Sequence, residues 1–330
     1  MNRKTLLTVL QYVFFFGLGA LLIAWQYGKL TAADKDQLYT AFMQVKERSW
    51  LVIPVVIISF LSHLFRALRW KLLMEPVQMT PRIMNVTFGV LIGYLVNLLL
   101  PRMGEVARCS VLAKYEDEPV DKIVGTMVAE RSFDFFCLIL VSLLTYLLQI
   151  DIANSYVQEQ LAALNLKGSA IIGILFLIVL FVFLLIFIYR RSKKTKIGAI
   201  LKGLGEGVMS IFKMKKRGFF LLYTFLIWFC YLSLIVIGFK ALDATQHLSW
   251  RAGLSLLVFG SLGMIATPGG IGAYPIAVQG VLVSVYHINK NFALAFGWVS
   301  WMVQTAVILV LGLVSLLFLP IYNAKKNQQG

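Results

Sequence analysis

The sequence predicts an all-α, polytopic membrane protein. Its 330 residues are 59% hydrophobic and only 14% charged, whereas a soluble domain carries roughly 25% charged residues. Several windows reach the ~20 apolar residues that a helix needs to cross the hydrocarbon core of a bilayer. These segments and their short connections occupy almost the whole chain, so there is little room for a soluble catalytic domain of ordinary size.

Six apolar segments are predicted to cross the bilayer as one helix each, and the shortest of them, residues 50–65, continues into "HLFRALRWKLL" at 63–73. Together they define a single integral membrane domain over residues 1–330, with a first half of about 1–165 and a second half of about 166–320. The six predicted spans are residues 5–27, 50–65, 125–149, 168–189, 218–240 and 292–319.

Two further apolar regions, 83–122 and 251–288, are each interrupted by proline and glycine. The two limbs of the second region, of about 16 and 13 residues, are too short to cross comfortably. We therefore predict two re-entrant hairpins in addition to the six full spans, which together give roughly an eight-span domain.

The positive charge of the chain predicts its orientation. Ten Lys or Arg and one acidic residue, Glu206, lie in the segment 190–217, and such basic segments remain in the cytoplasm. Alternating the spans from there places both termini in the cytoplasm and makes the two hairpins enter from opposite faces. This is the pattern of an inverted repeat with discontinuous helices, and it predicts a substrate site where the broken segments meet. The topology suits a bacterial inner membrane.

The remaining composition argues against several other classes of protein. The net charge of +16 is accounted for by membrane topology, so no nucleic-acid partner is predicted. Cys109, Cys137 and Cys230 match no metal or redox motif, and no ATP-binding glycine loop is present. We predict no catalytic residue, no metal and no cofactor.

Three clusters of charged residues fall within or beside apolar segments. In two clusters the members are three residues apart, which places them on one side of a helix; in the third, Glu130 and Asp134 are four apart and share a face, and Arg131 can reach Asp134 three residues further on. A charge at bilayer depth costs about 3 kcal/mol, so the clusters are either structural ion pairs or part of a polar site, and both interpretations remain open. The clusters are His63, Arg66 and Arg69; Arg102, Glu105 and Arg108; and Glu130, Arg131 and Asp134.

The chemistry that these groups suit is the binding of an anion. Arginine binds phosphate through its planar fork, and a helix that restarts after Pro101 offers free backbone N–H groups. The acidic residues would hold the arginines in place or bind a cationic headgroup. The glycines of "TPGGIGAYP" at 267–275 let backbone approach a ligand closely, although a tight hairpin turn explains them equally well. The candidate residues of this segment are Gly269, Gly270, Gly272 and Tyr274.

Four motifs resemble the lysylphosphatidylglycerol synthase transmembrane-region family of flippase-like membrane proteins. They are "FRALRW" at 65–70, "LLPRMGEVARCSVL" at 99–112, "VAERSFDF" at 128–135 and "TPGGIGAYP" at 267–275. The resemblance implies an all-helical domain of about eight spans. In the fused members of the family, this domain moves an aminoacylated phospholipid across the bilayer after a separate soluble domain has made it.

The resemblance also assigns residues to the family's motifs. Arg66 and Arg69 match its basic pair, and the block from Arg102 to Arg108, which includes Gly104 and Glu105, matches Pro-x-x-Gly-Glu-x-x-Arg. A third block, Glu-Arg-x-x-Asp, matches Glu130, Arg131 and Asp134.

The chain departs from the family in two respects. Many relatives have a glutamate shortly after the last glycine of the glycine segment, where this chain has Ala273, Tyr274 and Pro275. This departure argues against recognition of the same cationic lipid. The fused aminoacyltransferase domain is also missing, so we do not expect this chain to synthesise lysyl-lipid by itself.

The leading hypothesis is therefore a lipid flippase whose partners are membrane lipids with an anionic or zwitterionic headgroup. One alternative is a membrane-embedded transferase that uses a lipid-linked donor, with Asp34 and Asp36 of the first external loop as metal ligands or base. Another is an accessory subunit that associates with a lipid-synthesis enzyme. The sequence specifies neither the lipid nor the direction of its movement.

Overall fold

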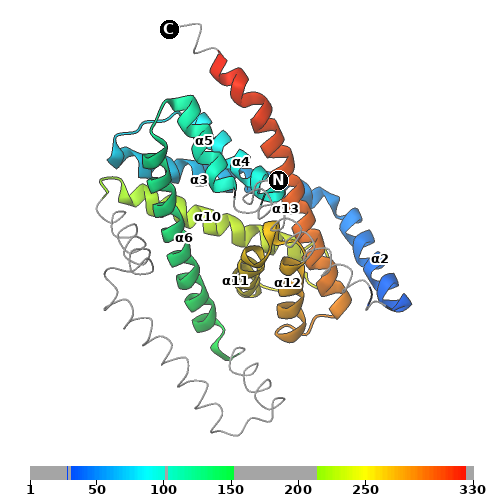
Figure 1. The fold of residues 1–330 in the computed structure, drawn as a ribbon. Coiled ribbons are helices and arrows are strands. Elements are labelled where there is room, and N and C mark those ends of the chain that lie inside the picture. The colour runs from blue at the N-terminus through cyan, green and yellow to red at the C-terminus, as the bar shows by residue number, and fades with distance from the viewer. Residues whose placement is uncertain (1–27, 29–30, 101–102, 152–213, 325–330) are drawn as a thin grey trace, which may run out of the picture. The chain divides into compact units, whose positions relative to one another are not determined.

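The computed structural model describes residue 28 and residues 31–100, 103–151 and 214–324. Every regular element in these ranges is helical, which confirms the all-α class (Figure 1). The helices are α2 (Ala32–Glu47), α3 (Val52–Met74), α4 (Ile83–Leu99), α5 (Gly104–Glu116), α6 (Val120–Leu148), α10 (Arg217–Phe239), α11 (Trp250–Ala266), α12 (Ala273–Ser284) and α13 (Lys290–Ala324), with the short 3-10 helices η1 (Ser49–Leu51), η2 (Glu75–Val77) and η3 (Pro268–Gly270).

Four of the described helical segments are long and apolar enough to cross a membrane. They are Ser49–Val77, Val120–Leu148, Arg217–Phe239 and Lys290–Ala324, and they confirm the predicted helices at 50–65, 125–149, 218–240 and 292–319. The predicted spans 5–27 and 168–189, and residues 190–213 of the basic segment, lie outside the described residues.

The chain divides into two compact units, one of residues 1–127 and 218–330 and the other of residues 128–217. The first unit contains both predicted hairpins, whereas the described part of the second unit is mainly the greater part of α6. The predicted division into halves near residue 165 falls outside the described residues and stays a prediction.

Both hairpins break at the residue that precedes a proline. Leu100, before Pro101, has φ −129° and ψ 107°, and Thr267, before Pro268, has φ −132° and ψ 155°. Proline clashes with a helical conformation of the preceding residue and forces it to be extended. The apolar helices α4 and α11 therefore end at the prolines, and the chain restarts as α5 and α12, as the sequence predicts.

The two limbs of the first hairpin pack backbone against backbone at glycines. A Cβ atom added to Gly104 would overlap the carbonyl oxygen of Gly93, and a Cβ added to Gly93 would lie 2.9 Å from the carbonyl oxygen of Gly104. One turn earlier, a Cβ on Gly89 would lie 3.4 Å from the carbonyl oxygen of Arg108. Small residues four apart on one helix allow this close approach.

The second hairpin uses the same device. In Figure 1, α11 and α12 lie side by side next to α13. A Cβ on Gly263 would lie 2.9 Å from Cα of Tyr274, and a Cβ on Gly260 would lie 2.9 Å from the ring of that tyrosine. The lack of a side chain at Gly260 and Gly263 therefore makes room for the start of α12.

Helix α13 supports both hairpins. A Cβ on Gly297 would lie 2.9 Å from Cα of Pro275 in α12, and one on Gly312 would lie 3.2 Å from the carbonyl oxygen of Leu91 in α4. The end of α4 also contacts η3, where a Cβ on Gly269 would lie 3.4 Å from Leu98. The breaks of the two hairpins therefore lie together, as expected for opposed hairpins.

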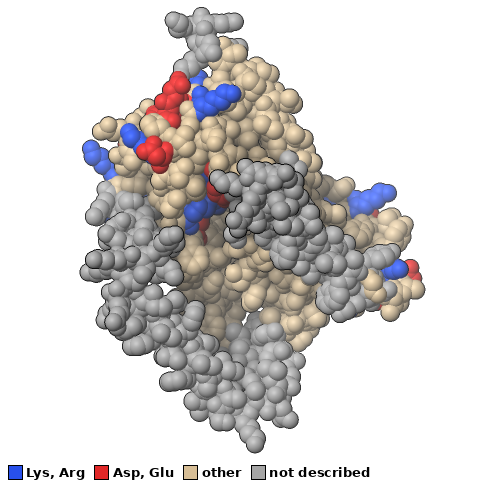
Figure 2. Space-filling view, viewed as in Figure 1, with Lys and Arg blue, Asp and Glu red and all other residues tan. Residues whose placement is uncertain are grey.

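Polar contacts hold α13 near each of its ends. Near its C-terminus, the side-chain amides of Asn323 and Asn85 donate to each other at 2.9 and 3.0 Å. Arg82 also donates to the side-chain oxygen of Asn323, and its Nε donates to Glu116 Oε1 of α5 at 3.1 Å. Near its N-terminus, Asn291 Nδ2 donates to Asp34 Oδ1 at 2.7 Å. In Figure 2, charged side chains gather around α2 and the end of the first unit where α5 and the last turns of α13 lie.

We expect Gly104→Ala to destabilise the protein, because the new methyl group would overlap the backbone of Gly93. Overpacking of this kind typically costs about 1–3 kcal/mol. The three cysteines are buried, so a thiol-reactive dye in detergent can report the unfolding temperature.

Gly280→Ala is the matched control, because nothing lies within 4 Å of a Cβ added there. Its midpoint should stay unchanged or rise, since alanine favours the helix by up to about 1 kcal/mol. Equal midpoints for Gly104→Ala and the native chain would contradict the proposed close packing.

Candidate functional site

One stripe of α3 contains the predicted basic pair. His63, Arg66 and Trp70 follow one another at helical spacing, and Arg69 lies beside Trp70. The exposed fraction is 5% for Arg66 and 0% for Arg69. Arginine is almost never fully buried unless other groups accept its hydrogen bonds, so this stripe is the first place to look for a polar site.

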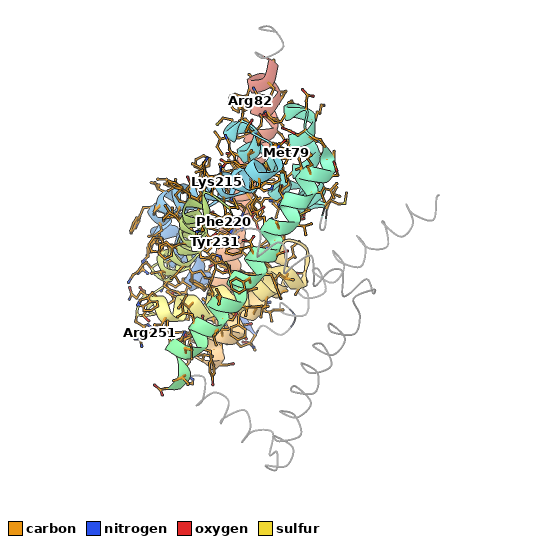
Figure 3. The ribbon with its side chains drawn as sticks, turned by 90° about the vertical axis from the view of Figure 1, so that its left-hand side faces the viewer. Met79, Arg82, Lys215, Phe220, Tyr231 and Arg251 are labelled. Carbon is orange, nitrogen blue, oxygen red and sulfur yellow. The ribbon has the colours of Figure 1, made fainter. Side chains whose placement is uncertain are left out.

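Helix α10 supplies partners for both arginines. Arg66 Nη2 donates to the hydroxyl of Tyr231 at 3.0 Å, and Arg69 Nη1 donates to Thr224 Oγ1 at 3.4 Å. The Arg69 guanidinium also lies 5.6 Å from the ring centre of Phe220. The spacing of Phe220, Thr224 and Tyr231 places them on one face of α10, and Figure 3 labels the first and last of them.

A third buried arginine comes from the first hairpin. Arg108 of α5 is 3% exposed, and its guanidinium lies 4.5 Å from the ring centre of Trp70. The indole N–H of Trp70 donates to Thr126 Oγ1 at 3.1 Å, which fixes the orientation of the ring. This cation–π contact brings Arg108 to the same side of α3 as the predicted basic pair.

The start of α5 differs from the expectation. The sequence predicts free N–H groups after Pro101, but the N–H of Gly104 donates to Asn97 Oδ1 at 2.7 Å. Asn97 Nδ2 donates in turn to Glu105 Oε2 at 3.4 Å. The prediction was wrong for Gly104, because the close packing of the hairpin brings the α4 amide within reach. Arg102 lies outside the described residues.

The glycine segment forms a tight turn. Gly269, Gly270 and Gly272 have φ angles of 60°, 72° and 72°, a left-handed conformation that strains other residues. The indole N–H of Trp301 donates to the carbonyl oxygen of Gly269 at 2.7 Å, and Tyr274 is buried in the core of the second hairpin. These observations favour the turn interpretation, and contact between these residues and a ligand stays a prediction.

The third predicted cluster belongs to the second unit and is described by itself. Arg131 Nη1 lies 3.7 Å from Asp134 Oδ2 on α6, which confirms the expected reach of an i,i+3 pair. Glu130, on the same helix, is buried.

The acidic residues of the transferase hypothesis begin α2, where Asp34 has a structural role. Asp34 and Thr31 form a capping box at the start of the helix. The hydrogen bond from Asn291, followed by those from Thr31, lowers the pKa of Asp34 to about 2. A carboxylate that already accepts hydrogen bonds within the protein and has a lowered pKa is a poor general base near neutral pH. Asp36 is exposed.

Several residues that complete the arginine cluster are absent from the sequence-based predictions. Trp70 lies inside the quoted motif "FRALRW", and its position next to Arg69 is the signal that could have identified it. Tyr94 of α4, whose ring centre lies 5.9 Å from the Arg66 guanidinium, and Tyr231 offered no such signal, because an aromatic residue in an apolar span also suits a lipid-facing position. The Gly89–Gly93 spacing could have predicted the close packing of the hairpin.

A family model described as "Lysylphosphatidylglycerol synthase TM region" matches residues 9–312. The chain belongs to this family. The match includes all the predicted site residues, and the suspected resemblance is thereby confirmed. No curated protein and no solved structure matches the chain. Membership of the lysylphosphatidylglycerol synthase TM region family, together with the apolar helices, makes this an integral membrane protein related to lipid handling.

The structural role of Asp34 predicts a pH-dependent stability. Because the pKa of Asp34 is lowered from 3.8 to about 2 in the folded chain, its carboxylate stabilises the fold above about pH 4. This contribution is lost as the pH falls through about 2. The unfolding midpoint of Asp34→Asn in detergent should lie below that of the native chain at pH 6, and the difference should shrink below pH 4.

Asp36→Asn serves as the control, because the exposed Asp36 side chain has no described role in the cap. Its midpoint should remain close to that of the native chain over the same pH range. A midpoint difference for Asp34→Asn that does not vary with pH would contradict the structural role.

Proposed function

We propose that this protein is a lipid flippase that moves a phospholipid, or another lipid-linked substrate with an anionic or zwitterionic headgroup, across the bilayer. The observation that carries the proposal is that three arginines are buried at one helix of a membrane protein: Arg66 and Arg69 belong to α3, and Arg108 packs on Trp70 of the same helix. Each of these side chains is 5% exposed or less. They therefore do not reach out to the membrane interface, as a snorkelling arginine would.

The energetics favour a functional role for this cluster. Each charge at bilayer depth costs about 3 kcal/mol or more, so charged residues in spans are retained mainly where they bind a substrate, an ion or each other. Guanidinium groups suit phosphate because their planar fork matches two of its oxygens. A phosphate-bearing headgroup is therefore the substrate chemistry that the cluster fits.

The two broken hairpins provide the second line of support. Non-helical backbone within a membrane is tolerated where protein or a water-filled cavity surrounds it, and transporters with discontinuous helices bind substrate where the breaks meet. We propose that the headgroup passes along this region while the acyl chains stay in lipid. Movement is passive or is coupled to an ion or proton through Glu105, Glu130 or Asp134.

The setting of this activity is also part of the proposal. The positive-inside rule places both termini in the cytoplasm, and we propose a bacterial inner membrane. A lipid-synthesis enzyme is the protein partner that would supply the substrate. The transferase alternative draws little support, because Asp34 is engaged at the cap of α2 and by Asn291.

Reconstitution into vesicles tests the proposal. Purified protein should move fluorescent phosphatidylglycerol between leaflets, as measured by chemical quenching of the outer leaflet. Arg108→Ala should lower the initial rate about tenfold or more, the change expected from loss of ~1.4 kcal/mol or more of binding. Arg108→Lys should lower it too, because lysine keeps the charge but lacks the fork.

Arg251→Ala is the matched control. Arg251 is an exposed arginine of α11, and Figure 3 shows it well away from Phe220 and Tyr231. Its rate should equal that of the native chain. If native protein moves neither phosphatidylglycerol nor a polyprenyl phosphate, the flippase proposal is wrong and the accessory-subunit alternative becomes the better one.

A further inference from the structure

A buried histidine, His63, lies on α3 close to Arg66, and the proposed function gives it no role. His63 is 6% exposed, and its Nδ1 atom has no hydrogen-bond partner among the described residues. A buried polar atom that has left water without gaining a partner is costly and calls for an explanation. The nitrogen of His63 is therefore a candidate for contact with a ligand.

The surroundings of His63 are shared with Arg66. The imidazole ring lies 4.7 Å from the ring centre of Tyr94 on α4, and the guanidinium of Arg66 lies 5.9 Å from the same centre. The two residues are three apart, so they occupy one face of α3. Tyr94 thus packs against both groups on one side, while the hydroxyl of Tyr231 accepts from Arg66.

The combination restricts the chemistry of the ligand. An apolar group would leave Nδ1 without a hydrogen bond, and a cationic group would be repelled by Arg66. A phosphate group can accept from both side chains, because imidazole N–H and guanidinium N–H are both donors and a charged acceptor strengthens each hydrogen bond. The pair therefore fits the phosphate of a lipid headgroup better than a neutral sugar or an amine.

We infer that His63 is a headgroup-binding residue that donates a hydrogen bond from Nδ1 to the lipid phosphate held by Arg66. This inference rests on the proposed lipid movement and adds a residue and a substrate chemistry to it. Because Nδ1 is enclosed by protein, the phosphate can reach it only when the surrounding helices move apart.

Two labelled lipids test the inference in the full-length, reconstituted protein. One is phosphatidylglycerol, and the other is a glucosyl diacylglycerol, which has no phosphate. His63→Leu should lower the rate for phosphatidylglycerol about tenfold. His63→Asn should restore most of that loss, because the amide nitrogen of asparagine can replace Nδ1 as a donor. The phosphate-free lipid should move slowly and to the same extent in all three proteins.

The outcomes separate this inference from the proposed function. If native protein moves phosphatidylglycerol and His63→Leu moves it equally well, the inference is wrong and the flippase proposal stands. If the substitution lowers the rates for both lipids equally, the role of His63 is structural and the inference is again wrong. If native protein moves neither this lipid nor a polyprenyl phosphate, it is the proposed function that has failed.

A second measurement observes His63 in the native chain and uses a substitution only to assign its signal. The sequence contains only three histidines, so ¹⁵N-labelled imidazole signals can be assigned with His63→Asn. Adding short-chain phosphatidylglycerol should shift the Nδ1 signal of His63 toward a hydrogen-bonded donor, whereas short-chain glucosyl diacylglycerol should leave it unchanged. A signal that responds to neither lipid, in a protein shown to bind phosphatidylglycerol, would overturn the inference.

Discussion

The packing of α4 against α5 at Gly93 and Gly104 is the contact on which the described site depends. Because neither residue has a side chain, the two backbones approach to a distance that a single methyl group would prevent. This approach lets Asn97 accept from the N–H of Gly104. It also sets the rotation of α5, so that Arg108, one turn further along, faces inward and lies over Trp70.

The rest of the first unit supports two breaks in the backbone that a membrane would not tolerate unprotected. Helix α13 packs on both hairpins through Gly297 and Gly312, and the indole N–H of Trp301 donates to the carbonyl oxygen of Gly269. The hairpins are similar in backbone and different in chemistry. The first contributes charge and a buried arginine, whereas the second contributes an apolar core around Tyr274.

Much of the architecture could be predicted because its causes are local. Apolar length predicts a spanning helix, and the prolines after Leu100 and Thr267 predict the breaks through a clash with the preceding residue. Spacing predicted that Arg66 and Arg69 share a side of α3 and that Arg131 reaches Asp134. The same local reasoning failed at Gly104, because the acceptor for its N–H, Asn97, lies on the other limb of the hairpin.

Composition, periodicity and the helix breakers were thus sufficient for the class of protein, the described spans and the existence of two hairpins. The partners of each arginine emerged only from the folded chain. Tyr231 and Thr224 lie more than 150 residues away from Arg66 and Arg69 in the sequence, and no local pattern joins them. Aromatic and hydroxyl side chains in an apolar helix are equally compatible with lipid and with a buried cation. The choice depends on which helix faces pack together, and long-range contacts alone determine that packing.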